Sequence, residues 1–331
     1  MGSRERSSGV ADTRPGALNY LDGTTESSLF RNGKVLTRRD AEGSDAEYIG
    51  VRVESHTLAI LNARILSGVT AKSCESNGFE LLNAPLDNPS LDFLDHQQVV
   101  RHYYPACEEL VSASTGAQAL AFDHNIRSAR GKKSTRRITG GQAVQGPAKM
   151  VHGDYTLYSA PQRLKDLSRP PGVNDTLRTV LAEGQSLITP GMVEDSLADD
   201  GRFAIINVWR NISEEPVQTN PMAMCDGQTV EPEDLVTFEI HYADRIGENY
   251  FAKYSDRHRF YCYPGMTRDE PMLLKQWDSD GGLARSAGKS SDASFPGGPC
   301  TFSFHTAFDD LQAPDDAPDR WSIEVRCLVI Y

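Results

Sequence analysis

The sequence predicts a mainly β fold with flanking helices, arranged as an antiparallel sandwich or barrel. Helical patterns dominate the first half of the chain, and short strand patterns separated by turns dominate the second half. Helices followed by runs of strands are typical of a sheet structure with helices packed on its outside. No repeat of fixed period is present, and the 331 residues are enough for one large domain with a sizeable core.

The elements of the first half follow from apolar spacing. Residues 1–15 are polar and charged and are expected to form a disordered tail, which leaves 16–331 as a single domain. The pattern over 95–114 predicts a helix with a kink or break at Pro105 and a stop at Gly116. The other expected elements are strands over 48–56, 119–122 and 150–156, a basic loop over 130–146, and helices over 161–167, 174–182 and 192–198.

The second half reads mostly as strands. Runs of β-branched and aromatic residues predict strands over 203–209, 235–242, 258–263 and 322–330. One helix is expected among them, because Thr267 to Glu270 forms a capping-box pattern and Met272, Leu273 and Trp277 would give the helix an apolar side.

Composition excludes several classes of function. The formal net charge of −12 argues against nucleic acid as a partner, because phosphate binding needs a basic surface. No stretch approaches the roughly 20 apolar residues of a membrane helix, and residues 1–14 lack the apolar region of a signal peptide. The six cysteines form no Cys-x-x-Cys pair, which indicates reduced, buried thiols. We therefore expect a cytoplasmic protein with a small-molecule partner; a homodimer stays open.

His152 and Asp154 form the central motif. Residues two apart on a strand point to the same face, so this imidazole and this carboxylate can meet one metal ion. A second histidine from elsewhere would complete the two-histidine, one-carboxylate triad of non-haem iron(II) enzymes. Such a short motif also arises by chance in a chain with eight histidines, and the alternative is a surface strand end with unrelated polar residues.

Downstream residues strengthen the metal hypothesis. His305 ends an alternating, strand-like segment, and Arg320 and Ser322 open the last predicted strand. The planar guanidinium of an arginine can make two parallel hydrogen bonds to a carboxylate, and a serine two residues on shares its face. The pattern therefore predicts an iron(II) enzyme that uses 2-oxoglutarate and O2, with His152, Asp154 and His305 as both metal ligands and catalytic residues. Ascorbate is expected to support the iron.

Several assignments stay open at this stage. His258 is the rival for the distal metal ligand, and Arg326 is the second choice for the co-substrate arginine. If Ser322 faces the pocket, alternation puts Glu324 and Arg326 there too, either as a solvated face or as a paired polar lining.

The remaining candidate contacts come from neighbouring segments. Asn207 and Trp209 share one face of their strand, and we assign Asn207 to the co-substrate. Candidate substrate contacts are Tyr155, Trp209, Arg210 and Arg127; each of them is equally well explained by core packing or a salt bridge.

The chain also resembles a largely fungal family of hydroxylases and desaturases. That family is related to a subunit of cephalosporin 7α-methoxylase and to gibberellin-desaturase-like proteins. The likeness runs from about residue 91 to the end and is carried by the segments 100–105, 122–127, 151–156, 207–210, 242–250, 261–266 and 318–326. It departs at Asn211, where members often have proline, and in the first 80 or so residues.

The resemblance implies a double-stranded β-helix, the cupin-like jelly roll, with iron and 2-oxoglutarate chemistry. It maps His152, Asp154 and His305 to the metal triad and Arg320 with Ser322 to the co-substrate site. The expected reaction is hydroxylation, desaturation or cyclisation of a small molecule, such as a secondary-metabolite intermediate. Two alternatives stand beside it: a zinc-dependent hydrolase at the same ligands and a non-catalytic partner subunit of a tailoring complex.

Overall fold

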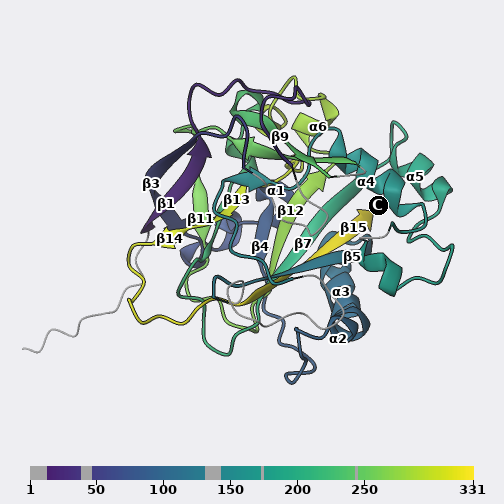
Figure 1. The fold of residues 1–331 in the computed structure, drawn as a ribbon, viewed down its shortest axis with the longest axis horizontal. Helices are drawn as coiled ribbons and strands as arrows, with labels where there is room; N and C mark the ends of the chain where they lie inside the picture. The colour runs from purple at the N-terminus through teal and green to yellow at the C-terminus, as the bar shows by residue number, and fades with distance from the viewer. Residues whose placement is uncertain (1–12, 39–46, 131–142, 173–174, 243–244) are drawn as a thin grey trace, which may run out of the picture.

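Two β-sheets carry most of the fold (Figure 1). This computed structural model describes residues 13–38, 47–130, 143–172, 175–242 and 245–331. Within them the larger sheet has the strand order β14 (Asp309–Asp310), β1 (Thr13–Leu21), β3 (Val53–Asn62), β11 (Phe260–Cys262), β8 (Met222–Cys225), β13 (His305–Ala307), β6 (His152–Gly153), β10 (Ile246–Ala252), β9 (Leu235–His241) and β2 (Leu36–Arg38). The smaller sheet has the order β4 (Phe79–Leu81), β12 (Met272–Asp278), β7 (Phe203–Asn211), β15 (Ser322–Ile330) and β5 (Gln118–Arg127).

Most neighbouring strands run antiparallel; within the described residues only β11 with β3 and β2 with β9 are parallel pairs of named strands. The main core cluster joins the two sheets. It contains Tyr250 of the larger sheet, Phe304 directly before β13, and Ile205 and Leu328 of the smaller sheet. Two packed antiparallel sheets with few helices are consistent with a jelly roll, which confirms the predicted fold class.

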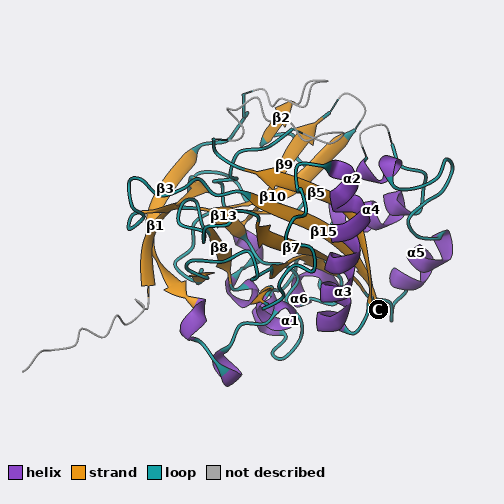
Figure 2. Cartoon of the chain, turned by 90° about the horizontal axis from the view of Figure 1, so that it is seen from below, coloured by secondary structure: helices purple, strands orange, loops and turns teal. Residues whose placement is uncertain are grey.

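The α-helices lie mainly on one side of the sheets (Figure 2). A second core cluster buries α3 against the outer face of β5, β7 and β15 through Val111, Ala121 and Val325. The helices are α1 (Cys74–Asn77), α2 (His96–Gln98), α3 (Tyr104–Thr115), α4 (Ser159–Leu167), α5 (Pro190–Ser196) and α6 (Gly282–Arg285). Short 3-10 turns are η1 (Ala63–Ile65), η2 (Gly68–Thr70), η5 (Thr176–Thr179), η6 (Gly227–Thr229), η7 (Pro232–Asp234) and η8 (Asp292–Ser294).

Pro105 explains the break in the long helical region. The predicted helix divides into α2, a π-helical turn η3 (Val99–Tyr103) and α3, in which Pro105 occupies the first turn. Proline fits there because its missing N–H needs no partner. The expected stop is also present, since Gly116 caps α3 with φ of 71°.

The expected helix after Thr267 is wrong. Met272, Leu273 and Trp277 belong to β12, which lies between β4 and β7 and is buried at every position. A strand covered on both faces needs no alternation, so its apolar residues matched helical spacing by coincidence. Glu270 does accept a hydrogen bond from the Thr267 N–H, but this contact closes a turn before the strand.

Other boundaries shift by a few residues. The strand expected over 48–56 is β3, which begins at Val53, and the segment expected over 150–156 keeps only the two residues of β6. The helix expected over 174–182 is the short turn η5. Of the expected tail, residues 1–12 lie outside the described residues and residues 13–15 belong to β1; most of the basic loop, 131–142, also lies outside them.

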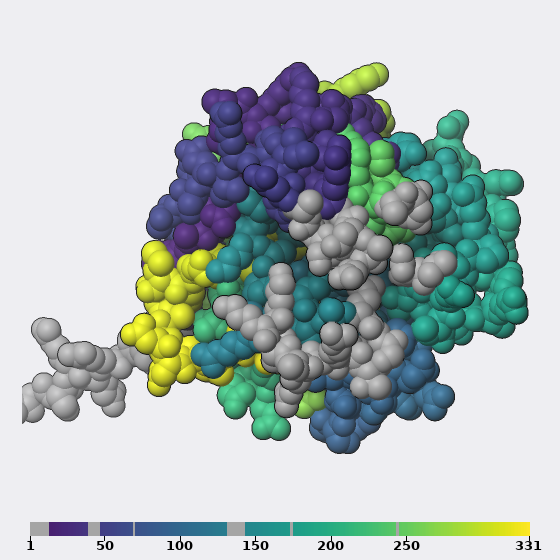
Figure 3. Space-filling view, viewed as in Figure 1, coloured from purple at the N-terminus to yellow at the C-terminus, as the bar shows by residue number. Residues whose placement is uncertain are grey.

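The N-terminal segment contributes strands β1, β2 and β3 to the larger sheet. Purple residues near the N-terminus lie beside green residues of the 240–250 region (Figure 3), in agreement with the pairing of β2 with β9. Among the described residues, no helix has the length and apolar character needed to cross a membrane.

Candidate metal centre

The structure brings His152, Asp154 and His305 together. β6 and β13 are neighbours, and His152 lies directly opposite His305 in their antiparallel pairing. Oδ1 of Asp154 lies 3.6 Å from Nε2 of His152 and 3.9 Å from Nε2 of His305. The candidate ligand atoms all lie within 4.8 Å of one another. One ion of ordinary size could therefore contact all three side chains.

The two histidines present the correct nitrogen to a metal. Nδ1 of His152 faces the carbonyl oxygen of Met150 at 2.8 Å, and Nδ1 of His305 faces that of Ser303 at 3.4 Å. A carbonyl oxygen only accepts, so each Nδ1 carries the proton and each Nε2 keeps its lone pair. Burial lowers the pKa of both histidines, to about 4 for His152, and this keeps the imidazoles neutral as metal binding requires.

Asp154 is oriented by its surroundings. Its Oδ2 accepts from Nδ2 of Asn207 at 3.3 Å and faces Nη2 of Arg326 at 3.6 Å, which leaves Oδ1 for the histidine side. Burial raises its pKa, but Arg326 and the two histidines lower it more, so the pKa lies well below its usual range. The carboxylate is therefore charged before any metal arrives.

Glu324 and Arg326 lie beside each other next to the metal group, as one of the two arrangements expected from the alternation of their strand. Asn207 donates to Oε1 of Glu324 at 2.7 Å, and Arg326 lies 3.8 Å from the same oxygen while it donates to Asp123 at 2.9 Å. Burial, followed by the charge of Asp154, raises the pKa of Glu324. Asn207 and Arg326 thus contact the candidate metal ligand and its neighbours, and their expected role at the co-substrate stays a prediction.

Arg320 is a buried cation near this group. Its Nη1 donates to the carbonyl oxygen of Asn220, its guanidinium lies 5.6 Å from the centre of the Trp209 ring, and its Nε has no partner among the described residues. Burial and the nearby charge of Arg127 lower its pKa to about 10. Ser322, also buried, lies opposite Arg127 where β15 begins.

His258 and Arg210 lie elsewhere. Nε2 of His258 faces the Asp234 carboxylate at 3.2 Å and its Nδ1 faces the Tyr20 hydroxyl at 3.3 Å, so both nitrogens are already engaged. Arg210 donates to the Tyr103 hydroxyl and to two backbone carbonyls, on the face of β7 opposite Asn207 and Trp209. The structure therefore joins His305 rather than His258 to the metal group, and it holds Arg210 away from it.

Tyr155 and Arg127 lie closer to the group. Burial raises the pKa of Tyr155 to about 12, and the charges of Arg163 and Arg326 lower it in part, so this side chain shares its environment with Arg326. Arg127 donates to the carbonyl oxygen of Gly146 at 2.9 Å, and its charge contributes to the lowered pKa of His152.

Gln276 is a neighbour that the sequence did not reveal. Its Oε1 accepts from the backbone N–H of Asp154 at 3.2 Å. It lies in the segment expected to be a helix, and only the strand β12 with its irregular register turns it toward the metal group. The position of Gln276 follows only from the pairing of β12 with β7, which the sequence alone did not reveal.

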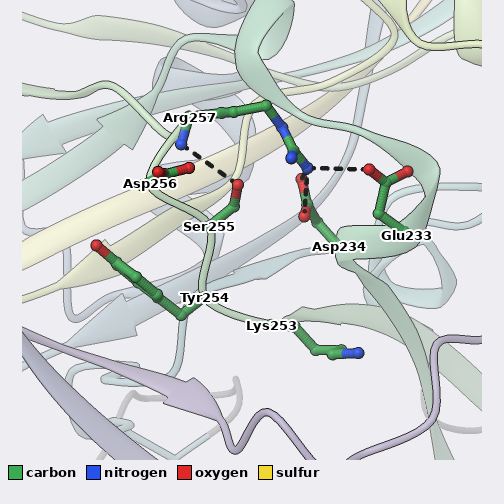
Figure 4. Close-up of a pocket in the computed structure, with 7 residues that line it drawn as sticks. All are labelled: Glu233, Asp234, Lys253, Tyr254, Ser255, Asp256 and Arg257. Atoms are coloured by element: carbon green, nitrogen blue, oxygen red, sulfur yellow. Dashed lines mark hydrogen bonds and ion pairs between the residues drawn. The ribbon is translucent and has the colours of Figure 1, made fainter.

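One open depression lies apart from these residues. It encloses about 440 Å³ and is lined by Glu233, Asp234, Lys253, Tyr254, Ser255, Asp256 and Arg257 (Figure 4). Arg257 pairs with both Glu233 and Asp234, so it offsets part of their negative charge. None of the metal-centre residues lines it.

The fold and the three converging side chains define a jelly-roll protein with a candidate two-histidine, one-carboxylate metal centre. The chain belongs to the family described as "YDMC: Oxidoreductase/YMDC permease-like domain", whose profile matches residues 18–330. Among solved structures, the iron and alpha-ketoglutarate-dependent endoperoxidase NvfI is similar, with a TM-score of 0.69, 21% identity, and coverage of 96% of this chain and 98% of that one. At this identity the likeness supports the fold.

Curated relatives come from bacteria and fungi. An uncharacterised protein in the dcmA 3' region of Methylophilus leisingeri is 44% identical over 196 residues, which cover 59% of this chain and 89% of the relative. The hydroxylase/desaturase poxK of Penicillium oxalicum is 27% identical, over 73% of this chain and 69% of the relative. The alpha-ketoglutarate-dependent dioxygenase phiK of a fungal species is 27% identical, over 78% and 79%. These relatives confirm the expected hydroxylase and desaturase family; the link to cephalosporin 7α-methoxylase stays a prediction.

Proposed function

We propose that this chain is a non-haem iron(II)- and 2-oxoglutarate-dependent oxygenase that acts on a small molecule, such as a secondary-metabolite intermediate. The observation that carries the proposal is the preformed ligand group: two buried, neutral Nε2 atoms and one charged oxygen of a partly buried carboxylate, all within 4.8 Å of one another. Three protein ligands of this kind leave positions open on iron for a co-substrate and oxygen. The names of the fungal relatives point to the same chemistry.

In this proposal His152, Asp154 and His305 hold the iron, which would supply the oxidising power once 2-oxoglutarate and O2 are bound. The donor set fits iron(II), because imidazole and carboxylate are its common ligands in open sites. Asn207 and Arg326 hold Oδ2 of Asp154 and so keep Oδ1 directed at the metal. Hydrogen bonds and ion pairs from neighbouring side chains commonly orient a metal ligand in this way.

Arg320 is proposed to bind the distal carboxylate of 2-oxoglutarate, with Ser322 beside it. The unpartnered Nε and the lowered pKa are both signs of a buried cation whose charge is only partly offset by Asp319 and Glu324. A buried charge without a counter-charge is unfavourable, and a carboxylate would remove that cost. Tyr155, Trp209 and Arg127 are proposed to face the substrate; a cytoplasmic location and a homodimer remain expectations.

The test is metal and co-substrate binding under anaerobic conditions. Purified protein with Fe(II) should develop a visible charge-transfer band when 2-oxoglutarate is added, and aerobic turnover of a substrate should release succinate. His152→Ala and Asp154→Ala should each abolish iron binding and the band, whereas His241→Ala, which removes a half-exposed histidine paired with Glu239, should keep both. A protein that binds zinc and hydrolyses esters without 2-oxoglutarate would refute the proposal.

A further inference from the structure

Gln276 is placed at the metal group by a β-bulge. In the pairing of β12 with β7, Lys275 lies opposite Ile206 and Trp277 lies opposite Ile205, so Gln276 is the extra residue. A bulge redirects the side chain of its extra residue, and such bulges are frequent beside active sites. The Gln276 side chain is fully buried, and its amide reaches the backbone of Asp154.

The orientation of this amide is fixed by one contact. The Asp154 N–H can only donate, so the atom that faces it at 3.2 Å must be the Gln276 oxygen Oε1. The amide nitrogen Nε2 then points elsewhere, and it has no hydrogen-bond partner among the described residues. A buried donor without a partner is unfavourable, and the missing partner must be an acceptor.

Asn207 and Arg326, whose side chains lie beside the Asp154 carboxylate, are both engaged with acidic groups. Nδ2 of Asn207 donates to Glu324 and to Asp154, so only its acceptor Oδ1 remains unpartnered. Arg326 donates to Asp123 and faces Asp154 and Glu324. Nδ2 of Asn207 is thus engaged with two carboxylates and the Arg326 guanidinium lies beside three, whereas Nε2 of Gln276 is a buried donor with no partner among the described residues.

We propose that Nε2 of Gln276 donates a hydrogen bond to an oxygen of the 2-oxo acid group at the metal centre. This inference rests on the proposed function. We choose the co-substrate over the substrate as the acceptor because Gln276 contacts the backbone of a metal ligand, and the 2-oxo acid group would bind at that same metal. Arg320, with its unpartnered Nε, would hold the opposite end of the same diacid.

Two variants separate this role from a structural one. Gln276→Glu keeps an oxygen that can accept from the Asp154 N–H but replaces the Nε2 donor by a second oxygen. The assay is run at slightly alkaline pH so that the new carboxyl group is ionised and cannot donate. Gln276→Met removes both functions at similar size. Asn77→Leu is the matched control, because the Asn77 amide is satisfied by Asp226 in another part of the fold. The measurements are Mn(II) affinity, and 2-oxoglutarate affinity of the metal-loaded protein by calorimetry.

We expect Gln276→Glu to bind 2-oxoglutarate on the order of 10- to 100-fold more weakly, as for a lost hydrogen bond to a charged acceptor, with Mn(II) affinity within about twofold of wild type. Gln276→Met should show the same loss and Asn77→Leu none. Unchanged 2-oxoglutarate affinity in Gln276→Glu would overturn the inference, as would a loss of affinity confined to the metal. A wild-type protein that binds Mn(II) but no 2-oxoglutarate would overturn the proposed function itself.

Discussion

Replacement of Arg326 by methionine should destabilise the protein, because the Arg326 guanidinium lies beside three acidic side chains. The guanidinium lies 2.9 Å from Asp123, 3.6 Å from Asp154 and 3.8 Å from Glu324, and it is mostly buried. Methionine fills similar space without a charge. The variant would leave the largely buried carboxylates of Asp123 and Asp154 without an ion pair to any lysine or arginine among the described residues.

The expected cost can be worked out from these distances. Two unit charges about 4 Å apart attract by roughly 4 kcal/mol at an effective dielectric constant of about 20, and part of this is offset by the burial of the arginine itself. Loss of one partner from a buried ion pair usually costs about 3–5 kcal/mol. A bound divalent ion would neutralise Asp154 but not Asp123. The metal-loaded variant should therefore lose only about half as much.

Urea unfolding followed by circular dichroism measures both quantities, once with a chelator and once with saturating Mn(II). Arg169→Met is the control, because Arg169 is exposed and its pair with Asp166 should contribute less than about 1 kcal/mol. A loss below about 1 kcal/mol in Arg326→Met, or an equal loss with and without metal, would refute the reasoning.

Two further predictions concern residues outside the ligand group. Arg210→Leu breaks three hydrogen bonds of a buried arginine and should cost about 2–4 kcal/mol of unfolding free energy with unchanged 2-oxoglutarate affinity, whereas a loss of affinity in the folded variant would place Arg210 in the site. Burial, only partly opposed by Asp123, lowers the pKa of His124 from 6.5 to about 4. Because the unfolded chain then binds the proton more readily, metal-free protein should lose up to roughly 3 kcal/mol from this group as the pH falls from 6.5 to 4. His124→Asn should reduce the slope of the urea midpoint against pH without abolishing it, since the pKa values of His152, His305 and His96 are also lowered, and an unchanged slope would contradict the assignment.

The sequence was most informative where local rules decide the structure. Alternation identified β15 over Ser322–Ile330, and Pro105 and Gly116 marked the start and end of α3. The spacing of His152 and Asp154 indicated a metal group because strand geometry alone puts such residues on one face. These features depend on neighbours in the chain.

The rest depends on contacts between distant segments. The sequence favoured His305 over His258 because Arg320 and Ser322 follow it, and the pairing of β6 with β13 then places His305 at the metal group. The face of β7 that holds Asn207 could be predicted, but its partners Glu324 and Asp154 come from β15 and from the segment after β6. Gln276 was missed because a strand buried on both faces imitates helical spacing, and because a bulge is not visible in one sequence.

The direct pairing of His152 with His305 has a consequence for folding. A metal ion bound there would link two segments from opposite halves of the chain and so close a very long loop. In the unfolded chain the ligands are not held together, so metal binding and folding are linked. The ion would favour the folded structure over every state in which β6 and β13 are apart. The supply of metal during synthesis would then influence how much of the chain reaches its final form.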